Sequence, residues 1–441
     1  MMNITEEQAL NYHQYPTPGK IEVVPSKPYA TAQDLSLAYS PGVAFPCESI
    51  HATPADVWKY TGKGNLVAII SNGTAVLGLG NIGAEASKPV MEGKALLFKV
   101  FAGINAFDIE VDTTDVDKFV DAVKAISPTF GGINLEDIKA PECFEIEERL
   151  KKECDIPVMH DDQHGTAIIV AAGMLNALSL QNKEIGSVKM VVNGAGAAAV
   201  ACTRMLVSLG MKKENIVMCD SKGVIKLSRG NLNPQKREFA TERDITELSE
   251  ALVDADVFLG LSVADVLTPE MLKSMAENPI VFALANPNPE IAYDLAKAAR
   301  PDLIFATGRS DLPNQINNVL GFPYIFRGAL DCHATCINEE MKHAAVHAIA
   351  ELAKQPVPEA VKQSYGREDL SYGPLYILPT PFDPRLLTAV APAVAEAAAK
   401  SGVARRPIED YAKYADYLEQ MMHHENEIFH CVTSHSRSCP L

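Results

Sequence analysis

Residues 189–210 read KMVVNGAGAAAVACTRMLVSLG, a short apolar run followed by a glycine-rich turn and a longer run with helical spacing. The short run predicts a buried strand, and the longer run predicts a helix that begins just after the glycines. A helix that starts there has free backbone N–H groups, which can bind the pyrophosphate of a dinucleotide. The predicted cofactor loop consists of Gly194, Ala195, Gly196, Ala197 and Ala198.

The next predicted strand, residues 215–220 (NIVMCD), ends at Asp220. An acid at this position usually bonds to the ribose hydroxyls of NAD and repels the extra phosphate of NADP. Ser221 and Lys222 follow at once, and a hydroxyl beside an ammonium can bind that phosphate. Alternatively, Lys222 is a solvent-exposed residue of a turn and has no role in binding. We predict NADP as the cofactor, with NAD as the alternative.

Strand-like and helix-like segments alternate on both sides of this unit. Further apolar runs that predict strands lie at residues 66–70, 107–111, 257–262 and 280–287. Such alternation is typical of an α/β fold with parallel sheets. We predict an N-terminal α/β domain (residues 1–160), then a Rossmann-type doubly wound dinucleotide-binding domain (161–400) and a helical extension with a loose tail (401–441).

Composition excludes several classes of protein. The 441 residues carry a net charge of −17, which opposes binding to nucleic acid or to anionic membranes. The longest apolar stretch, residues 166–180, is too short to span a bilayer, and no signal peptide is visible. Nine scattered cysteines fit reduced thiols. We therefore predict a cytoplasmic protein without nucleic-acid or membrane partners.

A second glycine segment, residues 78–83 (GLGNIG), matches the GxGxxG pattern letter by letter. Pro89 and Gly93 argue against the helix that must follow a dinucleotide loop, and no acid ends a strand at the right distance. We therefore place the dinucleotide at residues 194–199. For residues 78–83 a tight turn and a nucleotide loop stay equal alternatives.

Four acidic residues form two dense clusters, each after an apolar run. Glu136 and Asp137 follow GGINL, and Asp161 and Asp162 follow IPVMH. The carboxyl ends of parallel strands are where α/β proteins place their chemistry, and adjacent carboxylates repel each other unless a cation lies between them. Oxygen donors of this kind suit Mg²⁺ or Mn²⁺. Alternatively, Asp161 or Asp162 caps a helix that begins near Gly165.

Histidines beside these acids leave zinc as a weaker alternative. His160 and His164 flank the two aspartates, but no cysteine lies near them in the sequence. Cys332, His333 and Cys336 also have a loose ligand spacing, and we predict that they are helix residues instead.

Four more residues are candidates for chemistry or binding. Lys94 lies among apolar residues in MEGKALLFK, and loss of solvation there would lower its pKa and make it usable as a base. A surface lysine is the simpler interpretation. Tyr39, in LAYSPGVA, could equally be a core residue. Asn286 and Asn318 lie in amide-rich loops that either bind a carboxylate or carboxamide or form Asx turns.

The motifs SPGVA, GLGNIG, MEGK, NLEDI, HDDQHGTA, GAGAAA, ALANP and NNV occur in this order along the chain. Together they resemble the malic enzymes, divalent-metal-dependent oxidative decarboxylases of L-malate, over nearly the whole length. The resemblance is strongest to the bacterial NADP-type subgroup, in many of which a phosphotransacetylase-like domain follows. We expect this chain to lack that domain.

The resemblance implies roles for the matching residues. Tyr39 would be the general acid, Lys94 the general base in contact with substrate, and Asp161 the acid that supports the lysine. Larger malic enzymes have a substrate-clamping arginine where this chain has Ala75. The resemblance further implies a metal held by Glu136, Asp137 and Asp162, nicotinamide contact by Asn286 and substrate contact by Asn318.

The activity implied by the resemblance is conversion of (S)-malate to pyruvate and CO₂, with reduction of NADP or NAD and with Mg²⁺ or Mn²⁺. Decarboxylation of oxaloacetate and a homodimer or higher homo-oligomer are implied as well. One alternative is a 2-hydroxy-acid dehydrogenase without decarboxylation, which leaves the clustered acids unexplained. The other is a nucleotide-binding module with a decayed site, although every candidate site residue is present.

Overall fold

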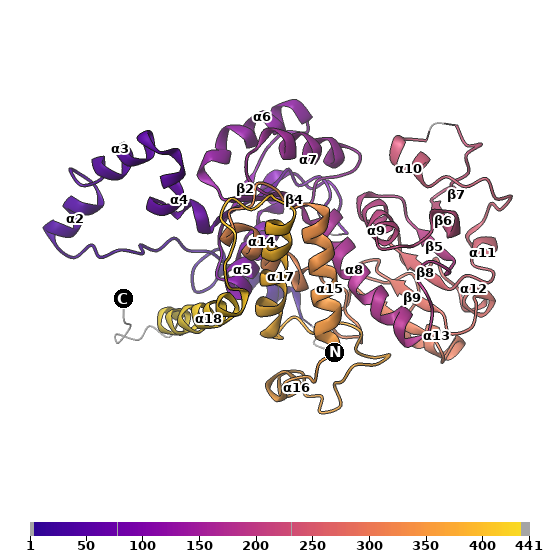
Figure 1. The fold of residues 1–441 in the computed structure, drawn as a ribbon. Helices are drawn as coiled ribbons and strands as arrows, with labels where there is room; N and C mark the ends of the chain where they lie inside the picture. Colours follow the sequence, from indigo (N-terminus) through magenta and orange to yellow (C-terminus); the bar gives the residue numbers. More distant parts are fainter. Residues whose placement is uncertain (1–3, 77, 231, 434–441) are drawn as a thin grey trace.

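The computed structural model describes residues 4–76, 78–230 and 232–433, and it contains two sheets built mainly from parallel strands (Figure 1). The first sheet has the order β2-β1-β3-β4, and all its pairings are parallel. Its strands are β1 (Leu66–Ser71), β2 (Asn105–Glu110), β3 (Gly132–Leu135) and β4 (Val158–His160). The connecting helices are α5 (Ala84–Ala102), α6 (Val116–Ile126) and α7 (Glu142–Glu153). Since helices cover this sheet, β1 and β3 are apolar and almost entirely buried.

The second sheet has the order β10-β9-β8-β5-β6-β7 and is parallel except for the short β7. Its strands are β5 (Met190–Asn193), β6 (Ile216–Asp220), β7 (Gly223–Val224), β8 (Val257–Gly260), β9 (Ile280–Ala283) and β10 (Ile304–Thr307). The order reverses at β5, as in a doubly wound dinucleotide-binding fold. The helices after these strands are α9 (Ala197–Ser208), α10 (Pro234–Glu238), α11 (Leu248–Ala251), α12 (Pro269–Ser274) and α13 (Tyr293–Ala299). This arrangement confirms the predicted fold class.

Long helices lie between the two sheets and join them into one hydrophobic core (Figure 1). Helix α8 (Asp161–Leu180) packs on α9 and on α15 (Glu339–Lys354), while α14 (Phe322–Asp331) packs on α5 and on α17 (Arg385–Lys400). The chain beyond β10 therefore returns to the first sheet. The remaining helices of this part are α16 (Glu359–Tyr365) and α18 (Tyr411–Thr433). The domain boundaries at residues 160 and 400 stay predictions.

The first part of the chain forms an arm that projects from the body (Figure 1). The arm contains α2 (Ala32–Ala38) and α3 (Ala44–Ala52) and joins the body through α4 (Val57–Tyr60), whereas α1 (Glu6–Gln14) comes before it; none of α1, α2 and α3 buries a residue. Between α1 and the arm, the backbone N–H of Lys20 donates to the side chain of Glu92 on α5, at 3.1 Å. Exposed large apolar side chains on the arm include Leu35, Leu37, Tyr39 and Phe45.

Helix boundaries differ from the sequence predictions at several points. Helix α5 runs through both Pro89 and Gly93, because its buried face, which includes Met91 and Phe98, packs against the sheet. We predicted a loose tail over the last twelve residues, but helix α18 extends to Thr433, so residues 430–433 are helical, and residues 434–441 lie outside the described part of the chain.

Two further boundaries differ near residues of interest. Helix α8 begins at Asp161 with His160 as its N-cap, so neither Asp161 nor Asp162 is the cap residue. Helix α14 ends at Asp331 and α15 begins at Glu339, so the prediction that Cys332, His333 and Cys336 are helix residues was wrong. His333 lies in a turn, with a left-handed φ of 48°. Among the described residues, no helix is long and apolar enough to cross a membrane.

Candidate active site

The four clustered acids follow two adjacent strands of the first sheet at the same level. Leu135, the last residue of β3, is paired with His160, the last residue of β4. Glu136 and Asp161 are the next residues along each strand, so the sheet register brings them to one edge. Asp137 has a left-handed φ of 54°, which aspartate tolerates better than most residues. Its backbone N–H donates to Asp162 Oδ2 at 2.8 Å, which fixes the two acids relative to each other.

Three of these acids could hold a metal ion. Glu136, Asp137 and Asp162 each offer a carboxylate oxygen, and these oxygens lie within 4.8 Å of one another. Burial raises the pKa of Glu136 further than Lys94 lowers it, and the other acids raise it again. A divalent cation would relieve this repulsion, so the residues present fit Mg²⁺ or Mn²⁺.

Of the two histidines beside the acids, His164 has other partners. His164 Nε2 lies 3.0 Å from Glu147 Oε2, and its Nδ1 lies 3.2 Å from Lys342 Nζ. The group of possible ligands within the described chain contains carboxylates alone. This composition favours Mg²⁺ or Mn²⁺ over zinc.

Lys94 lies buried on α5 and is held by two of the acids. Its Nζ donates to Asp161 Oδ2 at 2.5 Å and to Glu136 Oε1 at 3.0 Å. It also lies 4.1 Å from the centroid of the Phe322 ring. Lys94 is therefore not a surface lysine, and the packing of α5 against β1 and β2 explains its position.

The predicted direction of the Lys94 pKa shift was wrong. Burial alone lowers this pKa, as we expected, but the carboxylates of Asp161 and Glu136 outweigh burial and raise it above its usual value. In the absence of a cation, Lys94 is an ammonium ion that balances part of the negative charge.

Three residues position Asp161. Asn318 was predicted from the sequence as a site residue, whereas Thr166 and Gly165 were not. The Asn318 amide donates to Asp161 Oδ2 at 3.0 Å and accepts from the Thr166 hydroxyl at 3.2 Å. A Cβ on Gly165 would lie 1.9 Å from Asp161 Oδ1, so only glycine leaves room for this carboxylate. A glycine four residues after an acid, inside a helix, is a signal that could have revealed this constraint.

Tyr39 does not contact Lys94 or the clustered acids of its own chain. It is the C-cap of α2 and 77% exposed, on the arm that projects from the body (Figure 1). No hydrogen bond reaches its hydroxyl from any described residue, whereas its backbone N–H bonds to Leu35 within the arm.

The predicted dinucleotide loop has the expected geometry. Gly194 follows β5 with a φ of 122°, and a Cβ there would lie 2.2 Å from the carbonyl oxygen of Leu261. Gly196 is the N-cap of α9, whose first residues are Ala197 and Ala198. With Ala195 between the glycines, the loop presents the free N–H groups of the helix to an anion.

Asp220 ends β6 as predicted, but its partners differ from those expected. Arg229 donates to both of its oxygens, at 3.0 and 2.9 Å, and Lys236 Nζ lies 2.8 Å from Oδ2. Although burial alone raises it, these hydrogen bonds lower the pKa of Asp220 well below its usual range. Lys222 contributes its backbone N–H to Asp220, at 2.9 Å, rather than an ion pair. Arg229 and Lys236 carry no local motif, so the sequence analysis missed them.

Asn286 lies where loops from both sheets meet. It follows β9 and precedes a cis bond to Pro287. A Cβ on Gly308, after β10, would lie 3.0 Å from the Asn286 side chain, and a Cβ on Gly78 would lie 3.3 Å from its carbonyl oxygen. The first glycine segment is therefore a loop between β1 and α5 that contacts the Asn286 loop.

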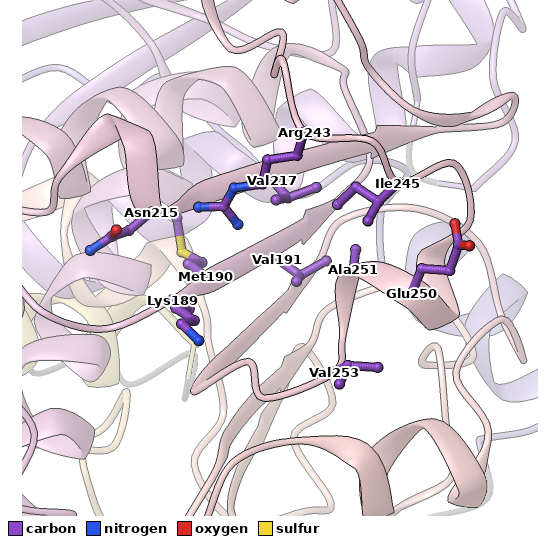
Figure 2. A pocket seen from close by; sticks show the side chains of 10 residues that line it. All are labelled: Lys189, Met190, Val191, Asn215, Val217, Arg243, Ile245, Glu250, Ala251 and Val253. Carbon is purple, nitrogen blue, oxygen red and sulfur yellow. The ribbon is translucent and has the colours of Figure 1, made fainter.

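A separate cavity of about 260 Å³ opens at the amino ends of β5 and β6 (Figure 2). Its lining includes the apolar side chains of Val191, Val217 and Ile245 and the basic side chains of Lys189 and Arg243. Gly194 follows the opposite end of β5, so this cavity does not belong to the dinucleotide loop.

Comparison with known families matches most of the chain. Residues 18–151 match the malic enzyme N-terminal domain, and residues 163–363 match the malic enzyme NAD-binding domain. The two matches meet near the boundary that we predict at residue 160.

Individual relatives agree with these matches. The NADP-dependent malic enzyme of Escherichia coli is 59% identical over 99% of this chain and 58% of its own length. An NAD-dependent malic enzyme of Rhizobium meliloti is 57% identical over 95% of this chain and 54% of its own length. The chain thus spans little more than half of these relatives. The crystal structure of malic enzyme from Pyrococcus horikoshii superimposes with a TM-score of 0.89 at 43% identity, covering 97% of this chain and 98% of that one.

Proposed function

The chain belongs to the malic enzyme family, and we propose that it converts (S)-malate to pyruvate and CO₂ with reduction of NADP, and less readily of NAD. One observation carries the proposal. A buried lysine contacts Asp161 and Glu136 at the carboxyl edge of a parallel sheet, and Glu136 is also one of three carboxylates that can hold Mg²⁺ or Mn²⁺. An NAD-dependent relative of similar identity supports NAD as a second cofactor.

The proposed roles of the side chains follow from their contacts. Glu136, Asp137 and Asp162 would hold the divalent cation, which would supply Lewis-acid chemistry, and the bound dinucleotide would supply the hydride acceptor. Lys94 would take the proton of the C2 hydroxyl. To do so it must first be neutral, and its short hydrogen bond to Asp161 offers a path for its proton. Asn318, already bonded to Asp161, would orient the substrate carboxylate.

The general acid that protonates C3 of enolpyruvate would be Tyr39, supplied by a second copy of the chain. The arm that carries Tyr39 buries none of the residues of α2 or α3 and exposes several large apolar side chains, which favours contact with a partner. A symmetric pair that exchanges arms would place each Tyr39 at the other chain's Lys94. We propose a homodimer, or a higher homo-oligomer built from such pairs.

Mixed oligomers test this arrangement. Tyr39→Phe and Lys94→Ala proteins, each expected to be nearly inactive, should recover about a quarter of the wild-type rate after random re-pairing of equal amounts. Half of the pairs are then mixed, and each mixed pair has one intact site. The control mixes Lys94→Ala with Asp137→Asn, which restores no complete site. If Tyr39 acted within its own chain, the first mixture would also stay inactive.

Gly165→Ala is expected to lower kcat about a hundredfold, because the added methyl group displaces the Asp161 carboxylate and with it Lys94. Gly173→Ala, in the same helix, is a matched control, since its added Cβ meets the flexible end of Leu378 at 3.3 Å. Steady-state rates and thermal unfolding midpoints should be measured for both. Wild-type kcat in a folded Gly165→Ala protein would contradict the role of Asp161.

Lys236→Ala should raise the KM for NADP about tenfold more than the KM for NAD. Without Lys236, the charge of Asp220 is less well balanced and repels the phosphate on the ribose. Lys222→Ala should act in the same direction but more weakly, because Lys222 reaches Asp220 through its backbone. Equal changes in KM for both cofactors would show that Lys236 does not contribute to binding of the phosphate on the ribose of NADP.

A cytoplasmic location is part of the proposal. Free thiols at Cys47, Cys143, Cys154, Cys202, Cys219, Cys332 and Cys336 support a reducing compartment.

A further inference from the structure

A group of basic side chains lies at the amino-terminal edge of the first sheet, opposite the edge that carries the acids. Lys63 precedes β1, and its Nζ donates to the carbonyl of Pro128, ahead of β3, at 2.7 Å. His333 follows α14, and the backbone N–H of Arg405 donates to the His333 carbonyl at 3.3 Å. Lys63, His333, Arg405 and the adjacent Arg406 are called the basic cluster below.

An indole ring joins two members of the basic cluster. The rings of Trp58 and His333 are stacked, with centroids 4.5 Å apart and an interplanar angle of 22°. Lys63 Nζ lies 5.3 Å from the centroid of the same indole ring. A Cβ on Gly131 would lie 3.4 Å from this ring, so the body of the protein holds the indole in place.

The acids near the basic cluster already have partners. Asp331 accepts from Arg327 Nε at 2.8 Å and from the Tyr414 hydroxyl at 2.6 Å. Asp155 is paired with Arg405. Within the described residues, no ion pair joins a carboxylate to Lys63, His333 or Arg406. The basic cluster therefore has more positive charge than its acids balance, in a chain whose net charge is −17.

Burial and neighbouring positive charges lower the pKa values of Lys63 and His333 in the basic cluster. Burial and the Arg405 guanidinium lower the pKa of Lys63, although Asp155 raises it. Burial, Arg406 and Arg405 lower the pKa of His333, although Asp331 raises it. An anion placed among these groups would be attracted to all of them and would favour protonated His333.

We infer that the basic cluster binds the phosphate group of a small soluble molecule, at a site separate from the active site. Lys63 and the pair Arg405 and Arg406 come from two distant segments that meet at Trp58 and His333. Their N–H groups would bind the several oxygens of a tetrahedral anion. The half-buried position of Lys63 reduces the screening of its charge by solvent. The opposite edge of the sheet carries the acids, so a ligand here does not compete with substrate.

The tryptophan offers a direct test, because Trp58 is the single tryptophan of the chain. Inorganic phosphate and pyrophosphate are titrated into the full chain at neutral pH, with sodium chloride at matched ionic strength as reference. A protonated imidazole stacked on an indole quenches its fluorescence. We therefore expect a saturable quench with phosphate and pyrophosphate, and none with chloride.

Variants test whether the quench of Trp58 fluorescence comes from phosphate bound at the basic cluster. Lys63→Gln and Arg406→Gln should each weaken phosphate binding about tenfold. Lys212→Gln, at an exposed lysine elsewhere on the surface, should bind as the wild type does. Circular dichroism checks that each variant is folded. His333→Gln should abolish the quench, while isothermal calorimetry still detects binding.

Several outcomes would overturn the inference. One is the lack of a saturable change at millimolar phosphate, and another is a wild-type response in folded Arg406→Gln. A response to phosphatidic acid vesicles without any to soluble phosphate would assign the surface to membranes. A change that follows protein concentration rather than phosphate would assign it to contacts between copies of the chain.

Discussion

Replacement of Lys94 by alanine is expected to lower kcat for malate oxidation about a thousandfold, the usual contribution of a positioned acid or base. Lys94 is the one described lysine that contacts Glu136 and Asp161, so no other amine replaces it there. The loss should appear in kcat rather than in the dissociation constant for NADP, because the dinucleotide loop lies on the other sheet. Stopped-flow absorbance of reduced nicotinamide measures the hydride step directly.

Lys99→Ala is the matched control for this variant. Lys99 lies on the same helix α5, and its Nζ contacts Asn105 on the surface at 3.2 Å. We expect wild-type kinetics for Lys99→Ala. If a folded Lys94→Ala protein keeps more than about a tenth of the wild-type kcat, Lys94 is not the base.

Removal of divalent cations should abolish turnover, and added Mn²⁺ or Mg²⁺ should restore it. The prediction depends on the three carboxylates whose oxygens lie within 4.8 Å, an arrangement that repels itself without a cation. Asp137→Asn is the sharpest variant, because asparagine also tolerates the left-handed φ of 54° and changes only the charge. It should lose most of its activity and bind Mn²⁺ at least about tenfold more weakly.

Mn²⁺ binding can be followed without turnover, by electron paramagnetic resonance and by the rise of the unfolding temperature with Mn²⁺ concentration. Asp112→Asn, at an exposed acid after β2, is the control and should behave as the wild type. Full malate oxidation in a metal-free sample, or unchanged Mn²⁺ affinity in Asp137→Asn, would rule out this metal site.

The sequence predicted those parts of the site that depend on local order along the chain. The strand, turn and helix around Gly194 follow each other directly, and so do the acids after β3 and β4. In these segments, hydrophobic periodicity and turn residues determine the local structure. Parallel strands then bring their carboxyl ends to one edge, so clustering of Glu136 and Asp161 could be expected from the fold class.

Other features depend on contacts between distant residues and could not be predicted in this way. The pKa of Lys94 is set by carboxylates 42 and 67 residues away, so reasoning from its apolar neighbours gave the wrong sign. Arg229 and Lys236 reach Asp220 from 9 and 16 residues away, through a segment without a motif. Tyr39 lies on an arm whose helix α2 has no buried residue. The spacing of residues along the arm does not determine what the arm packs against, so the position of Tyr39 could not be predicted.

The most direct test of the proposed activity is the product ratio with malate, NADP and Mn²⁺. Reduced nicotinamide is measured by absorbance, and pyruvate, CO₂ and oxaloacetate are measured in the same reaction. We expect equal amounts of pyruvate, CO₂ and NADPH, without accumulation of oxaloacetate. Release of oxaloacetate in place of pyruvate would identify a simple dehydrogenase, and binding of NADP without turnover would identify a decayed site. Either result would contradict the proposed activity.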